Sequence, residues 1–147
     1  MMFEPLSGRR EVKVTERRAG NGFAQCVRDL AEMHYPGAEK IVLAMDNLNT
    51  HTLASLHATF KPEAALRLAQ RLEIHNAPKH GSWLNMAEVE IGAMSRQCLG
   101  RGIPSLEEMV NEVKSRVAQR NSTKTTVRWQ FATADARIKL QHLYPRV

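Results

Sequence analysis

The apolar run Ile41–Met45, which ends at Asp46, constrains the fold more than any other feature of this sequence. The run contains no polar residue, as expected of a strand that is covered on both faces in an α/β domain. In open sheets of this kind, reactive groups gather at the carboxyl ends of the strands. We therefore expect Asp46 to lie at the functional edge of a central strand.

Hydrophobic spacing on either side of this run predicts the remaining elements. Two strands joined by a Ser7–Gly8 turn come first, with Val12 and Val14 alternating with charged neighbours in the second strand. The later elements are a helix over 22–34, helices over 52–60 and 62–72, a strand over 73–77, and helices over 83–100, 105–120 and 134–143. This order predicts one α/β domain over residues 1–147, with a mixed sheet and helices on both faces.

Composition narrows the classes of function. Lys and Arg number 21 against 15 acidic residues, and the formal charge of +6 favours polyanionic partners such as DNA or RNA. The basic side chains of the stretch 114–128 would suit non-specific phosphate contacts, although such runs are usually a solvated face. Cys26 and Cys98 lack metal-ligand spacing, which favours a reducing compartment. No signal peptide or membrane-spanning run is evident, so we expect a cytoplasmic protein.

Carboxylates in the second half of the chain are candidate partners for Asp46. A divalent cation such as Mg²⁺ takes oxygen ligands, often only one or two of them protein carboxylates, and two such ions can drive phosphoryl transfer. Glu88 and Glu90 flank the apolar face of the helix predicted over 83–100, and periodicity does not choose between them. In the alternative interpretation, Asp46 and Asn47 merely cap the helix that begins near Thr50 and Thr52.

Polar residues around these carboxylates are candidate contacts to a phosphate backbone. Lys79, His80 and Ser82 come just before a predicted helix start, where free backbone N–H groups gather. His51 could contact a phosphate, although a lone histidine is more often structural. The full set of candidate DNA-binding residues is Asn47, His51, Lys79, His80, Ser82 and Asn85.

Several phrases together resemble the catalytic domain of bacterial insertion-sequence transposases of the mariner-like superfamily. They are Phe3–Gly8, Val12–Thr15, Met45–His51, Pro78–Glu88, Trp129–Phe131 and Asp135–Leu140. The resemblance covers essentially the whole chain. It implies a ribonuclease-H-like fold and a site of two aspartates and one glutamate that binds Mg²⁺ or Mn²⁺ and cuts and joins double-stranded DNA.

The resemblance also assigns residues. Asp46 matches the family's second aspartate, and Glu88 matches the glutamate that follows a Leu–Asn pair, which favours Glu88 over Glu90. The family's first aspartate lies on a strand upstream of Met2, and no aspartate precedes Asp29. The resemblance thus implies a partial catalytic domain that lacks the first strand and cleaves DNA very slowly or not at all.

Two further expectations follow from this interpretation. A sheet without its first strand has unpaired edges, so we expect a homo-oligomer or a partner chain that supplies a strand. The alternative function is a non-catalytic fragment that binds DNA or full-length transposase as an inhibitor, or is a remnant. DNA binding that does not depend on Asp46 would favour that alternative.

Overall fold

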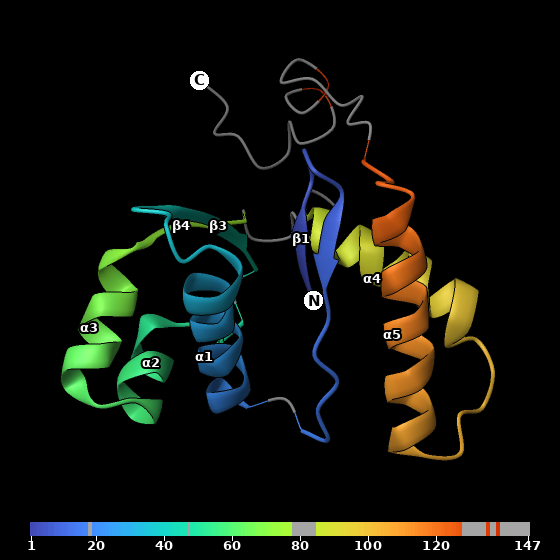
Figure 1. Cartoon of the computed structure of the whole chain (residues 1–147), viewed down its shortest axis with the longest axis horizontal. Coiled ribbons are helices and arrows are strands. Elements are labelled where there is room, and N and C mark those ends of the chain that lie inside the picture. The colour runs from blue at the N-terminus through green and yellow to red at the C-terminus, as the bar shows by residue number, and fades with distance from the viewer. Residues whose placement is uncertain (18, 47, 78–84, 128–134, 136–137, 139–147) are drawn as a thin grey trace.

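The computed structural model describes residues 1–17, 19–46, 48–77, 85–127, 135 and 138 (Figure 1). Its elements are β1 (Met2–Glu4), β2 (Arg9–Glu11), α1 (Gly20–Asp29), the π-helical turn η1 (Leu30–His34), β3 (Ile41–Met45), α2 (Leu53–Thr59), α3 (Pro62–Gln70), β4 (Leu72–Asn76), α4 (Met86–Cys98) and α5 (Leu106–Ser122). The chain is therefore a mixed α/β protein, and the predicted order of elements is confirmed through α5. The final helix predicted over 134–143 falls almost wholly outside the described residues. No helix in the described ranges is long and apolar enough to cross a membrane.

β1 and β2 form an antiparallel hairpin in which Phe3 lies opposite Arg10. Gly8 closes the turn with a φ of 72°, and a Cβ there would lie 3.0 Å from backbone atoms of Lys124 and Thr125, so the position requires glycine. The pairing ends where Met2 meets Glu11. The prediction that Val12 and Val14 continue the second strand is therefore wrong, because they have no strand opposite them.

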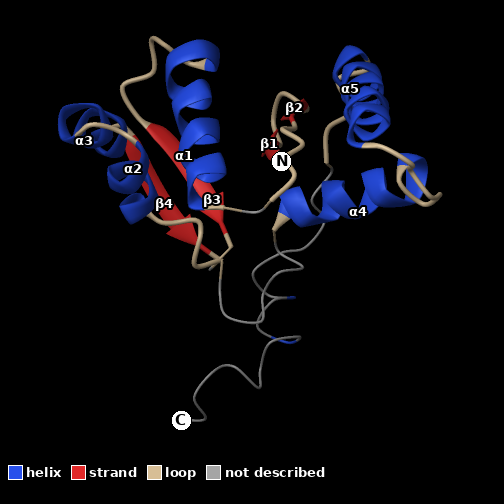
Figure 2. Ribbon diagram, turned by 90° about the horizontal axis from the view of Figure 1, so that it is seen from below, coloured by secondary structure: helices blue, strands red, loops and turns tan. Residues whose placement is uncertain are grey.

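β3 and β4 form a parallel pair, and α1, α2 and α3 cover one of its faces (Figure 2). Apolar residues of α1, η1, α2 and α3 make up the main core, with Ile41 of β3 and Leu72 of β4 packed against it. The buried members are Ala24, Val27, Ala31, Leu56, Ala65 and Leu68. α3 begins with Pro62, whose missing N–H costs nothing in the first helical turn.

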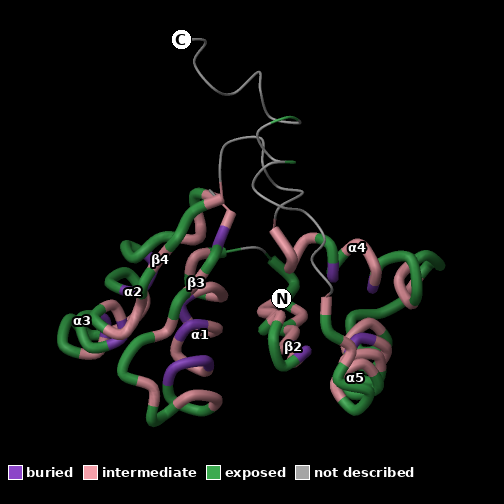
Figure 3. Tube along the Cα trace, turned by 90° about the horizontal axis from the view of Figure 1, so that it is seen from above, coloured by how far each residue is buried: buried purple, intermediate pink, exposed green. Residues whose placement is uncertain are grey.

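On the opposite face of this parallel pair, the described residues are exposed. Val42 is 64% exposed and Ala44 is also exposed, next to the exposed Glu73 and His75 of β4 (Figure 3). The prediction that this strand is covered on both faces is therefore wrong. An all-apolar run does not reveal whether one or both faces are covered, and here the described helices pack only on the face that carries Ile41 and Met45.

The strands form two sheets instead of the single mixed sheet that we predicted. Across the molecule the order is β4, β3, β1 and β2, and no strand pairing joins β3 to β1 in the described part (Figure 2). We call α1, η1, α2, α3, β3 and β4 the core half, and β1, β2, α4 and α5 the hairpin half. Polar contacts link the two halves: Tyr35 Oη donates to Glu4 Oε2 (2.8 Å), and the Arg9 guanidinium donates to His34 Nδ1 (2.7 Å).

Candidate functional site

Asp46 lies directly after β3, where the sequence placed it. The carboxyl ends of β3 and β4 are directed toward the part of the molecule where α4 begins (Figures 1 and 2). The Asp46 side chain is 26% exposed and contacts His51. It does not cap the following helix, because the N-cap of α2 is Thr52. The alternative interpretation of Asp46 as a helix cap is therefore wrong.

His51 is brought to Asp46 by the turn after β3. Its Nδ1 lies 2.6 Å from Asp46 Oδ1, and since a carboxylate only accepts, Nδ1 carries the proton and donates. The imidazole ring also stacks on Phe23 of α1, with centroids 4.9 Å apart. His51 was a candidate contact to DNA from the sequence, and its bond to Asp46 was missed. The five-residue spacing across one turn was the available signal.

Glu88 lies in the first turn of α4 and is partly exposed. Asn85 is the N-cap of this helix, and its side-chain oxygen accepts a bond from the Ala87 N–H (3.1 Å). Within the described part of the chain, no hydrogen bond or ion pair engages the Glu88 carboxylate.

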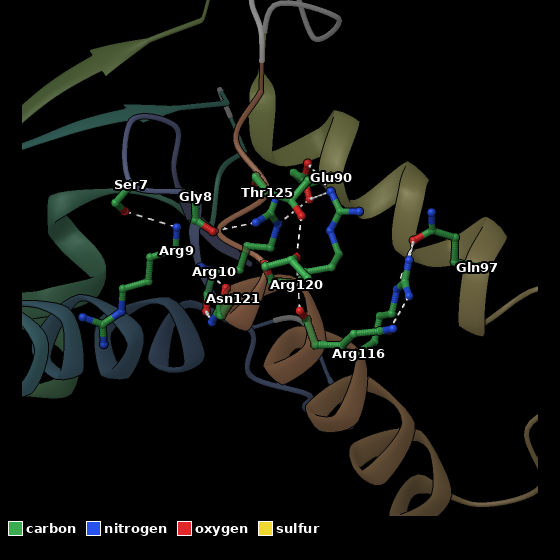
Figure 4. A network of polar contacts seen from close by, with 12 residues as sticks. Ser7, Gly8, Arg9, Arg10, Glu90, Gln97, Arg116, Arg120, Asn121 and Thr125 are labelled. Carbon is green, nitrogen blue, oxygen red and sulfur yellow. Dashed lines mark hydrogen bonds and ion pairs between the residues drawn. The ribbon is translucent and has the colours of Figure 1, made fainter.

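Glu90, two residues further, has a structural environment. Its side chain is 4% exposed and its Oε2 accepts a bond from Arg10 Nε at 2.5 Å, while Arg120 lies 3.0 Å from both oxygens (Figure 4). Arg10, itself 1% exposed, also donates to the carbonyls of Gly8 (2.6 Å) and Thr125 (2.8 Å). This network ties the β1–β2 hairpin to α4 and α5.

Burial and charge act in opposite directions on Glu90. Burial raises the pKa of its carboxyl, but the hydrogen bonds and positive charges of Arg10 and Arg120 outweigh burial, so the pKa of Glu90 lies below its usual value. The group is therefore ionised and paired with two guanidinium groups at neutral pH. A cation would have to displace those arginines to reach it.

The basic residues of α5 are partly used within the fold. Arg120 belongs to the Glu90 network, and Arg116 donates to Gln97 and to Gln119 (2.6 Å). Arg101, which precedes α5, pairs with Glu112 of that helix. The predicted phosphate-binding stretch 114–128 therefore has fewer unengaged cations than its sequence indicates.

The remaining candidates divide between described and undescribed parts of the chain. Asn47, Lys79, His80 and Ser82 lie outside the described residues, whereas Asn85 is described and caps α4. The described residues contain no group of three or more His, Cys, Asp or Glu that could hold a metal ion. The hard oxygen donors of Asp46 and Glu88 still fit a cation that takes one or two protein carboxylates.

Comparison with known proteins adds one finding. A family model described as DDE superfamily endonuclease matches residues 1–110 of the 147. Neither the curated proteins nor the solved structures gave a match. The matched range contains both Asp46 and Glu88, together with every described strand.

Proposed function

Because the chain belongs to the DDE superfamily of endonucleases, we propose that it is a domain for metal-dependent cleavage and transfer of DNA strands, of the mariner-like transposase type that its sequence resembles. In this proposal Asp46 and Glu88 are the metal ligands. The family match supports the class of reaction, and the state of the individual carboxylates supports the choice of ligands.

The observation that carries the assignment is the difference between Glu88 and Glu90. Glu90 is buried and bound by two arginines, whereas the Glu88 carboxylate has no partner among the described residues. Asp46 uses Oδ1 to accept from His51, and no described residue bonds Oδ2. These oxygens, which no described residue engages, support Asp46 at the end of β3 and Glu88 at the start of α4 as the ligands.

The metal would supply Lewis-acid activation of the attacking oxygen and stabilisation of the leaving oxygen. Mg²⁺ or Mn²⁺ suits this role because both prefer oxygen ligands and accept phosphate oxygens in the remaining positions. Asp46 and Glu88 are two carboxylates, fewer than the three that the family resemblance implies. We therefore expect weak metal binding and slow strand cleavage by this chain alone.

Calorimetric titration with Mn²⁺, run beside a supercoiled-plasmid nicking assay, tests the proposal. The variants are Asp46→Asn and Glu88→Gln, each of which removes one charge with little change of shape. Glu73→Gln is the matched control, because Glu73 is an exposed glutamate on β4 outside the site. We expect Mn²⁺ binding in the wild-type chain and the control, and its loss in both site variants.

Absence of Mn²⁺ binding in the wild-type chain would contradict the proposal. If salt-dependent DNA binding then persisted unchanged in Asp46→Asn, the chain would instead be a non-catalytic DNA-binding module. Mn²⁺ binding that survives Glu88→Gln but not Asp46→Asn would keep Asp46 as a ligand and remove Glu88.

We also propose that the two sheets are parts of one ribonuclease-H-like sheet, completed by a strand from a second copy of the chain. The Asn121 side chain bonds the backbone N–H and C=O of Arg10, so these groups point away from β1. Phe3 lies opposite Arg10, and its own N–H and C=O therefore point away from β2, to the outer edge of β1. The β3–β4 register likewise turns the backbone groups of Val42 and Ala44 away from β4. These two open edges lie on neighbouring sides of β1 and β3 (Figure 2).

Light scattering combined with hydrogen exchange tests this arrangement. If a second copy adds a strand, the mass should rise with concentration, and the amides of Phe3, Val42 and Ala44 should become protected at the same concentrations. The amide of Ile41 is the internal control, because it already donates to the Arg71 carbonyl (2.7 Å). A monomer with all three edge amides unprotected at every concentration would refute the arrangement.

A further inference from the structure

We propose that His51 is a positioning residue, which holds the Asp46 carboxylate in one orientation for a divalent cation. The inference rests on the proposed function, because it concerns the role of Asp46 as a metal ligand. It adds a residue that the sequence assigned to DNA contact, and it gives that residue a different task.

The contact between the two side chains is short and partly shielded from water. His51 Nδ1 donates to Asp46 Oδ1 at 2.6 Å, and the two side chains are 30% and 26% exposed. A free aspartate at the end of a strand would sample several rotamers and lose that freedom when it bound a metal. A bond to Oδ1 restricts the carboxylate in advance and leaves Oδ2 without a described partner.

The His51 ring is itself held from the side. It stacks on Phe23 with an interplanar angle of 28°, and Phe23 packs against the main core through α1. An imidazole placed by an aromatic neighbour in this way loses little further freedom when it donates a bond. The position of Nδ1 is thus set by the core half and not by Asp46 alone.

The backbone of the turn is fixed independently of the ring. The N–H of His51 donates to the Leu48 carbonyl (2.9 Å), and the hydroxyl of the buried Ser55 donates to the Thr50 carbonyl (3.0 Å). Gly20 leaves the space that this arrangement needs, because a Cβ there would lie 2.9 Å from Ser55 Oγ. The turn is therefore anchored to α2, and α1 leaves room for that contact.

These contacts form a chain of support from the core to the ligand. Phe23 and Ser55 hold the ring and backbone around His51, and His51 holds Asp46. Hydrogen bonds to a ligating carboxylate commonly contribute about 10- to 100-fold to metal affinity, because they fix the ligand's orientation. Since the pair is partly exposed, we expect an effect near the lower end, about tenfold.

Two substitutions separate donation from stacking. His51→Phe keeps an aromatic ring for Phe23 but removes the donor, whereas His51→Asn loses the ring but places an amide donor close to the position of Nδ1. His75→Phe is the matched control, because His75 Nε2 also pairs with a carboxylate, that of Glu73, at 2.8 Å on the open face of β4. Each chain is titrated with Mn²⁺ at one mildly alkaline pH, and its urea unfolding is measured in parallel.

If His51 positions Asp46, Mn²⁺ should bind about tenfold more weakly to His51→Phe, and close to normally to His51→Asn and His75→Phe. The reverse order, with His51→Asn the weaker binder, would overturn the inference, because it would show that ring packing matters and donation does not. Equal affinity in all variants would overturn it too. His51→Leu replaces His51→Phe if unfolding shows that the larger ring is not accommodated.

The same titration distinguishes failure of the inference from failure of the proposed function. Mn²⁺ binding that is lost in Asp46→Asn but unchanged in His51→Phe would leave the proposed function standing and refute the role of His51. No Mn²⁺ binding in the wild-type chain would refute both.

Discussion

At the scale of single residues, Glu88 and Glu90 of α4 lie in different environments. Residues two positions apart on an α-helix point about 200° apart, so Glu88 and Glu90 cannot share an environment. Periodicity did not choose between them, because the arginines that bind Glu90 are 80 and 30 residues away in the chain. Only the three-dimensional arrangement brings Arg10 and Arg120 to it.

Removing the charge of Glu90 should therefore affect stability, whereas removing the charge of Glu88 should affect metal binding. Glu90→Gln leaves the buried Arg10 and the partly buried Arg120 without their counter-ion, and we expect it to lower the free energy of unfolding by about 3 kcal/mol. Glu88→Gln should leave the free energy of unfolding nearly unchanged and weaken Mn²⁺ binding. Urea unfolding and calorimetry on both variants check this, and a stable Glu90→Gln would contradict the structural role of the network.

The Glu90 network also predicts a dependence on pH. The folded protein lowers the pKa of Glu90 below its usual value of 4.5. The ionised carboxylate is therefore more favourable in the folded than in the unfolded chain and stabilises the fold. The stability that Glu90 contributes is complete above its unfolded pKa and disappears as pH falls through its lower folded pKa. The difference in unfolding free energy between wild type and Glu90→Gln should thus shrink with acidification, and a difference that grew instead would oppose this assignment.

At the scale of elements, local signals predicted most of the secondary structure. The capping pair Ser105 and Glu108 marked the start of α5, and Ser105 Oγ does accept the Glu108 N–H (3.1 Å). Pro62 marked the start of α3 in the same way. Local patterns did not reveal how distant segments pair and pack. They missed the early end of β2, the exposure of Val42 and the separation of the strands into two sheets.

Asn85 shows how an element's cap affects the interpretation of a site. The sequence suggested a contact to DNA, whereas the Asn85 side chain accepts the Ala87 N–H at the start of α4. We expect Asn85→Ala to cost about 1 kcal/mol of unfolding free energy, and Asn85→Asp, which keeps the acceptor, to cost much less. Urea unfolding of the two variants measures this. Equal losses in both would point to a role other than capping.

At the scale of the whole molecule, the two halves have separate buried interiors. The core half is built around Leu56 and Leu68, and the hairpin half around Met94, Val113 and the Glu90 network. Polar contacts lie between them, such as that of Tyr35 with Glu4. Because apolar burial supplies most of the cooperativity in a fold, halves joined by polar contacts should open separately.

Native-state hydrogen exchange tests whether the halves open separately. Leu68→Ala removes a side chain that is 1% exposed, so we expect it to destabilise the core half by about 3 kcal/mol and to speed exchange of the Ile41 amide by about a hundredfold. Amides in the middle of α5 should change little. Val113→Ala, at a site 3% exposed, is the matched variant in the hairpin half and should show the opposite pattern. Equal acceleration in both halves by either variant would mean that the chain unfolds as one cooperative unit, with the polar contacts strong enough to couple the two interiors.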